Sequence, residues 1–159
     1  KPTVIGIATG MVAGLATITP AAGTVGPEGA LLIGLLAGFV CFYATQLVKI
    51  TFRIDDTLDV FPVHGVGGMV GILMLSFLGL EDGFLGSAAA GLSDQANSSP
   101  VSQLIIQLKG IAVIGTWTAV ASWTILKFVS LFTDLRVSEE EEYVGLDVTE
   151  HEERSYDLS

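Results

Sequence analysis

The sequence predicts an all-α polytopic membrane protein. Half of the 159 residues are hydrophobic and 15% are charged, which is too apolar for an ordinary soluble domain of this length. The apolar residues form four long segments, and none of these alternates polar with apolar residues over the roughly ten positions that a membrane β-strand needs. We therefore expect helices, with the lipid bilayer as their surroundings and no nucleic acid among the partners.

Four membrane helices are expected in residues 1–133, at about 4–19, 29–49, 59–80 and 101–133. The second apolar run, from Ala30 to Val48, would span roughly 28 Å at the helical rise, close to the thickness of a hydrocarbon core. The fourth run, from Leu104 to Phe132, would be roughly 44 Å long, so it must tilt or project from the bilayer. Pro27 and Pro100 stand where the second and fourth helices begin, and a missing N–H costs nothing there.

Residues 134–159 form an acidic tail, whose ten acidic and two basic side chains give −8 of the net charge of −10. Because the sequence begins with Lys1 and has no initiator methionine, we expect a piece of a longer protein. Apart from Lys109, and Arg154 within the tail, the basic residues lie at alternate ends of successive segments: Lys1, Lys49 and Arg53, and Lys127 and Arg136. The positive-inside rule places these ends and the tail in the cytoplasm, in a plasma or inner cell membrane.

The stretch DDTLDVFPVHGVGG, from Asp55 to Gly68, carries His64 into the third apolar segment. At 100° per residue the imidazole shares its helical face with Val60, Gly67, Gly68 and Gly71, so a glycine trough is expected beside it. Such a histidine can hydrogen-bond a neighbouring helix, but intramembrane ionisable groups are rare and usually functional. We therefore favour a functional role for His64.

The three aspartates before His64 admit two interpretations. Asp55, Asp56 and Asp59 can cap the third helix and favour its N-terminal dipole, or they can form a vestibule that attracts cations. A metal site is not expected, because Asp59 lies about 140° around the helix from His64 and the other histidine, His151, is in the tail.

Glycines spaced by four form small-residue ridges on three of the segments, which permit close helix approach. The ridges are Gly6, Gly10 and Gly14; Gly34 and Gly38; and Gly67 and Gly71. By themselves they identify no function.

Three collinear motifs resemble the ammonium transporter (Amt/Mep/Rh) family. The Asp55–Gly68 stretch is similar to the family's D-D-x-x-D-V-F-x-V-H-G-V-x-G signature. GLATITPAAGTVGPEGALLIG, from Gly14 to Gly34, resembles its G-L-V-x-x-T-P-A-x-G segment. LRVSEEEEYVGLDVTEHEERSY, from Leu135 to Tyr156, resembles its cytoplasmic tail. Together the motifs cover nearly the whole chain.

The resemblance implies the last four of eleven transmembrane helices, in a fold of two inverted five-helix repeats that forms homotrimers with one pore per subunit. Ammonium or ammonia would be the substrate, with no enzyme activity and no cofactor. By similarity His64 is the cytoplasmic member of twin pore histidines. The other residues assigned to the pore vestibule or its structural support are Asp55, Asp56, Asp59, Val60, Phe61, Gly67 and Gly68.

For the tail the resemblance implies a regulatory segment that folds back beneath the subunits, with a P-II-type regulatory protein as a candidate partner. Its assigned residues are Gly145, Leu146, Asp147, His151 and Tyr156. Composition alone leaves a solvated, disordered tail as the alternative. Two residues depart from the family pattern, since Pro62 and Glu152 stand where glycine is common.

Other functions remain open beside the transporter. An ammonium sensor would use the same fold and pore to signal, with little or no transport, and a fused cytoplasmic signalling domain would favour it. A membrane anchor without a substrate would not need His64 on a glycine-lined face, and the Rh-type branch fits the tail less well.

Overall fold

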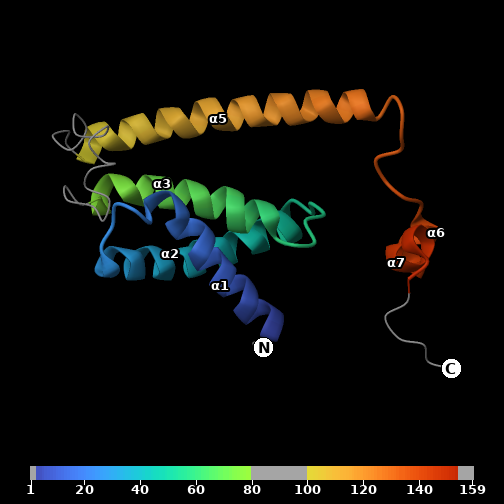
Figure 1. Ribbon diagram of the computed structural model, residues 1–159, viewed down its shortest axis with the longest axis horizontal. Helices are drawn as coiled ribbons and strands as arrows, with labels where there is room; N and C mark the ends of the chain where they lie inside the picture. Colours follow the sequence, from blue (N-terminus) through green and yellow to red (C-terminus); the bar gives the residue numbers. More distant parts are fainter. Residues whose placement is uncertain (1–2, 80–99, 154–159) are drawn as a thin grey trace. The chain divides into compact units, whose positions relative to one another are not determined.

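The structure is a computed structural model that describes residues 3–79 and 100–153, which are helical throughout apart from their connections (Figure 1). The elements are α1 (Val4–Ile18), η1 (Thr19–Ala21), α2 (Pro27–Gln46), η2 (Leu47–Thr51), η3 (Phe61–Val66), α3 (Gly67–Leu78), α5 (Pro100–Val129), α6 (Glu139–Val144) and α7 (Leu146–His151). Leu80, the predicted end of the third helix, and Tyr156 lie outside the described residues.

Four helical spans are long and apolar enough to cross a membrane. They are Val4–Ala21, Pro27–Thr51, Phe61–Leu78 and Pro100–Val129. No strand occurs in residues 3–79 or 100–153, so the predicted class, an all-helical membrane protein with several spans, is confirmed.

The first two helices begin at the positions that local chemistry favours. The Thr3 side chain accepts a hydrogen bond from the N–H of Gly6 at 3.0 Å and thereby caps α1. Pro27 is the first residue of α2, with Glu28 beside it in the first turn, where the proline lacks only an N–H that has no helical partner and the anion favours the dipole.

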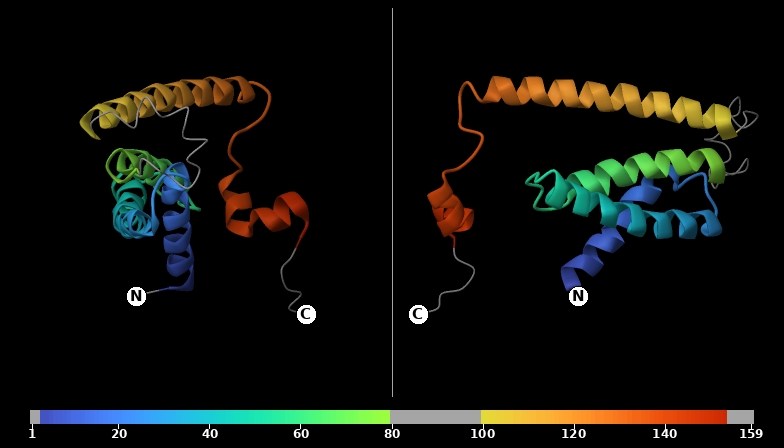
Figure 2. Two further views of the ribbon diagram at one scale, coloured as in Figure 1. Left: turned by 60° about the vertical axis from the view of Figure 1, so that its left-hand side comes forward. Right: turned by 180° about the vertical axis from the view of Figure 1, so that it is seen from behind.

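Helices α1, α2 and α3 pack together, and we call residues 4–78 the packed unit. In two views α1 runs obliquely across α2 and α3 (Figures 1 and 2). The core between them consists of small and medium side chains, with Ala13, Cys41 and Val63 in one cluster and Ala16 packed against it. Small residues let the helix backbones approach closely.

One of the three glycine ridges brings two described helices together. A Cβ on Gly67 would lie 2.7 Å from Oγ1 of Thr17 and 3.3 Å from Sγ of Cys41, and a Cβ on Gly71 would overlap the carbonyl oxygen of Thr17. On the ridges of α1 and α2, Cβ atoms on Gly10, Gly14, Gly34 and Gly38 would meet nothing within 4 Å, so no neighbouring helix of the packed unit crosses closely at these four glycines.

The chain divides into two compact units, Lys1–Ala112 and Val113–Ser159, with the boundary inside α5. α5 is one uninterrupted helix of 30 residues, none of them buried, and its length of roughly 45 Å fits the expected overlong span. Beyond it, α6 and α7 are short helices joined at Gly145.

Candidate functional site

His64 lies in a π-helical segment, Phe61–Val66, which precedes α3. The sequence predicts an ordinary α-helix here, so the widened turn is a difference from that expectation. Pro62 contributes no N–H to the turn. Single π-helical turns of this kind occur often at functional sites.

The third span has one packed face and one open face. Pro62, Val63 and Gly67 are buried, whereas His64 is exposed. A Cβ on Gly68 would meet nothing within 4 Å, so the space beside this glycine is open, as it is at His64. The expectation of a trough formed by all three glycines is wrong for Gly67 and Gly71, because α1 fills the space beside them.

Asp56 caps the segment that carries His64. Its Oδ1 accepts a hydrogen bond from the N–H of Val60 at 2.9 Å, and its Oδ2 accepts one from the N–H of Phe61 at 2.8 Å. The hydroxyl of Thr57 donates to Oδ1 of Asp55 at 3.3 Å. The Asp56 carboxylate therefore satisfies two N–H groups at the start of the helix, as a capping aspartate does.

Asp59 is held from the side by a cation. Its Oδ1 lies 2.8 Å from Nζ of Lys49, which belongs to η2, and the Asp59 side chain is only 17% exposed. Its φ of 55° is in the left-handed region, which aspartate adopts more readily than most residues. In the sequence, Lys49 indicates only the orientation of the spans, and nothing in the linear pattern indicates this pairing.

Two further residues assigned near His64 lie on the surface of the third span. Val60 and Phe61 are exposed, and the Phe61 ring covers Gly65, where a Cβ would lie 3.2 Å from Cδ2. No group of three His, Cys, Asp or Glu side chains within residues 3–79 and 100–153 could hold a metal ion. The described chemistry here is therefore one imidazole, a capping carboxylate and one ion pair.

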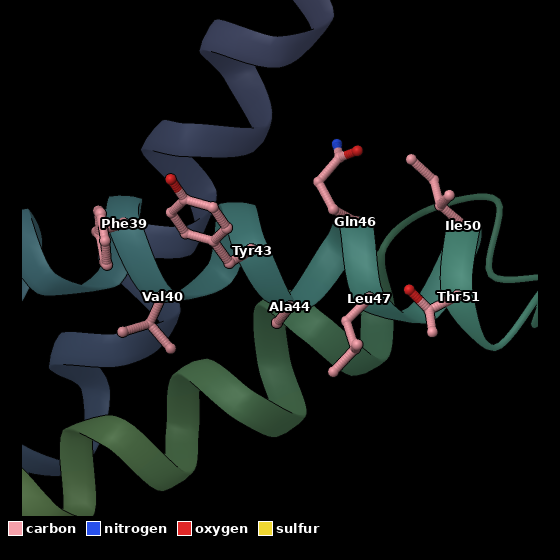
Figure 3. A pocket seen from close by; sticks show the side chains of 8 residues that line it. All are labelled: Phe39, Val40, Tyr43, Ala44, Gln46, Leu47, Ile50 and Thr51. Carbon is pink, nitrogen blue, oxygen red and sulfur yellow. The ribbon is translucent and has the colours of Figure 1, made fainter.

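Two hollows lie on the surface of the packed unit. The larger, of about 720 Å³, is an apolar groove along α2 and η2 whose lining residues are shown in Figure 3. The smaller, of about 360 Å³, is lined mainly by α1 and α2 and includes Asp59 and Val63. His64 lines neither, so neither joins the open face of the third span.

The tail is structured by contacts between near neighbours. The N–H of Glu141 donates to Oγ of Ser138, and the N–H of Ser138 donates to Oε2 of Glu141 at 2.8 Å, which makes a capping box. The Ser138 hydroxyl also donates to Oε2 of Glu141 at 2.7 Å. This bond and the one from the Ser138 N–H lower the pKa of the Glu141 carboxyl below its ordinary value. The S-x-x-E pattern was present in the sequence and is a known signal for such a box.

The tail residues assigned by similarity lie at the junction of the two short helices. Gly145 has a φ of 107° between α6 and α7, Leu146 and Asp147 begin α7, and His151 ends it. Glu152 follows in the left-handed region with a φ of 53°, so the glutamate adopts the conformation that glycine favours. Tyr156 lies outside the described residues.

Comparison with known proteins gives a consistent result. The sequence pattern of the Ammonium Transporter Family matches residues 1–156. The chain is 38% identical to an ammonium transporter of Bacillus subtilis, covering 98% of this chain and 37% of that protein. It is 40% identical to ammonium transporter Amt1 of Archaeoglobus fulgidus, covering 98% and 38%. The chain thus spans little more than a third of the length of these relatives.

A solved structure is similar over the same extent. The crystal structure of a Mep2 mutant from Candida albicans matches with a TM-score of 0.71 and 25% sequence identity. The match covers 98% of this chain and 35% of that one.

Proposed function

Because the chain belongs to the ammonium transporter family, we propose that the protein containing it conducts ammonium or ammonia across a membrane and that His64 lines the path. The relatives from Bacillus subtilis and Archaeoglobus fulgidus are both named ammonium transporters. Since this chain spans 37% of the Bacillus subtilis protein, the proposal concerns the whole protein, to which these spans contribute one wall.

The observation that carries the proposal is the position of His64. Its imidazole is exposed on the side of the third span that does not pack on α1, while the preceding residue, Val63, is buried in the core. An ionisable side chain in an apolar span is costly and is rarely kept without a function. The open space at His64 and Gly68 is where a conducted molecule would pass, once the rest of the protein closes the path.

The chemistry of the substrate suits this arrangement. A charged, hydrated ammonium ion is expensive to move through an apolar path, whereas neutral ammonia is not. Leaving a proton behind therefore eases the crossing. One imidazole nitrogen can accept a hydrogen bond from the substrate while the other is hydrogen-bonded to a second group. The ring can take up a proton at one nitrogen and release one from the other.

Replacing His64 tests the proposal directly. In the full-length protein, His64→Ala should abolish methylammonium uptake, because the polar contact in the path is removed. His64→Glu keeps a hydrogen-bonding, proton-exchanging group and should retain some flux, while admitting potassium because the carboxylate can be charged. The measurements are radiolabelled uptake and current in reconstituted membranes at matched protein amounts.

The control is Val113→Ala, which shortens an exposed side chain of α5 and should leave uptake unchanged. Uptake at the parental rate with parental selectivity in His64→Ala would contradict the role of His64. If the parental protein itself shows no uptake but changes conformation when ammonium is added, the sensor is the better description.

The finer parts of the proposal rest on the family resemblance. They are a twin histidine outside this chain, a homotrimer, a cytoplasmic tail and a P-II-type partner. Crosslinking in native membranes should yield trimers, and protease added to inside-out vesicles should remove the tail. A tail protected in inside-out vesicles but cleaved in right-side-out ones would reverse the orientation.

A further inference from the structure

The contact between Lys49 and Asp59 joins two parts of the packed unit that the chain separates by a loop. Nζ of Lys49 in η2 lies 2.8 Å from Oδ1 of Asp59, just before the third span. The Asp59 side chain is 17% exposed and that of Lys49 is 39% exposed. Lys49 is exposed, but the Oδ1 atom of Asp59 that faces it is buried. Removing the lysine charge would leave that buried oxygen without a charged partner, so the pair favours the geometry in which the two groups meet.

The backbone of Asp59 extends this contact into the helix. Its carbonyl oxygen accepts a hydrogen bond from the N–H of Val63 at 2.9 Å, one residue before His64. Its own N–H donates to the carbonyl of Asp56 at 3.2 Å, and the Asp56 carboxylate caps Val60 and Phe61. The first turn of the third span is therefore tied to Asp59, and Asp59 is tied to Lys49.

The rotation of this turn decides where His64 points. Val63 is buried against Ala13 and Cys41, while the adjacent His64 is exposed. Adjacent residues on a helix diverge by close to a right angle, so a rotation that withdrew Val63 from the core would carry the imidazole away from the open face. A π-helical turn is rare within α-helices, and here the Asp59 contacts lie directly at its start.

We infer that the Lys49–Asp59 ion pair positions His64, by holding the start of the third span in the rotation that turns the imidazole to the open face. The inference rests on the proposed function of His64. Lys49 and Asp59 would touch no substrate, so both are positioning residues, and their loss should reduce the conduction rate more than the amount of folded protein.

Single variants of the full-length protein and one double variant test this. Lys49→Met keeps most of the length of the side chain without its charge, and Asp59→Asn keeps a residue that tolerates the left-handed conformation. Lys49→Arg preserves the pair. The control is Arg53→Met, which removes a neighbouring cation from a residue that also has a positive φ, of 53°. The readouts are the maximal rate and KM of methylammonium uptake, and the thermal midpoint.

Lys49→Met and Asp59→Asn should each lower the maximal rate on the order of tenfold, because a small displacement of a reacting group is enough for such a loss. Their thermal midpoints should stay near that of Arg53→Met, and Lys49→Arg should keep most of the rate. The double variant Lys49→Met/Asp59→Asn should be no worse than either single one, as for two residues that act through one contact.

Additive losses in the double variant, or parental rates in both single variants, would overturn the inference. So would a lowered thermal midpoint with an unchanged rate, because that is the result of a purely structural role. If Lys49→Met does not insert into the membrane, the comparison of uptake rates between Asp59→Asn and Lys49→Arg tests the inference instead. His64→Ala separates the two hypotheses. Normal uptake by His64→Ala would refute the proposed function. Loss of uptake in His64→Ala, together with parental uptake rates in Lys49→Met and Asp59→Asn, would refute only the positioning role.

Discussion

The tail and the packed unit are stabilised in opposite ways. In the tail the contacts connect residues three to six positions apart, as in the Ser138–Glu141 capping box and the Arg136–Glu142 ion pair at 3.2 Å. In the packed unit the closest approach joins Thr17 with Gly67 and Gly71, which are about fifty positions away. The tail therefore depends on local hydrogen bonds, and the packed unit depends on the absence of side chains.

The two regions should consequently respond to different substitutions. Adding one methyl group is harmless where a helix faces open space but costly where a backbone lies against the glycine. Removing one hydroxyl or one left-handed glycine affects a local hydrogen-bonded turn and little beyond it. Three substitutions sharpen this contrast, from the largest expected effect to the smallest.

Gly71→Ala should have the largest effect. Its new Cβ would overlap the carbonyl oxygen of Thr17 and lie 2.9 Å from Cγ of Pro20, so α1 and α3 must separate. We expect a loss of about 3 kcal/mol in the free energy of unfolding, as for an overpacked core, measured by thermal unfolding of the full-length protein in detergent. Gly110→Ala is the control, because a Cβ there meets nothing within 4 Å. Equal stability of the two variants would show that α1 and α3 are not in close contact.

Gly145→Ala should have an intermediate effect. A φ of 107° is strained for any residue with a Cβ, and that atom would lie 2.7 Å from Oδ1 of Asp147. We expect the junction of α6 and α7 to lose about 1–3 kcal/mol of local stability. Hydrogen exchange at the N–H groups of Val148 and Thr149, which donate to the Gly145 carbonyl, would measure it.

The control for this variant is Val148→Ala, which leaves the backbone unstrained. If the tail couples the subunits, as the resemblance implies, uptake should fall in Gly145→Ala as well. Faster exchange with unchanged uptake would mean that the tail folds but regulates nothing. Unchanged exchange would contradict the positive φ.

Ser138→Ala should have the smallest effect, confined to the first turn of α6. The hydrogen bonds from Ser138 lower the pKa of Glu141, so losing the hydroxyl should raise that pKa toward its ordinary value. A group whose pKa is lowered by folding contributes stability above its unfolded pKa and loses it as the pH falls through the folded value. In the parental protein α6 should therefore fray on acidification. An NMR titration measures the pKa of Glu141 in the parental protein and in Ser138→Ala. The same pKa in the two proteins would exclude the capping box in solution.

The same contrast explains which features could be predicted. The four spans follow from long apolar runs, and the start of α2 follows from Pro27 and Glu28, because these signals lie within a few residues. The partners of Gly67 and Lys49 do not follow, because they depend on which helices meet. Hydrophobic periodicity places His64 on a helix but does not say which neighbouring glycines α1 will cover, and the π-helical turn changes the angular spacing on which that estimate relied.

The burial of Cys41 gives this chain an internal reporter. Cys41 as a whole is 3% exposed. Its sulfur lies where α1, α2 and α3 meet, 3.3 Å from the position that a Cβ on Gly67 would take. It is the one cysteine of the sequence. A membrane-permeant maleimide should therefore alkylate it only when these three helices part. The rate at which the peptide containing Cys41 becomes alkylated in intact vesicles, followed by mass spectrometry, would time the opening of the packed unit without any introduced label.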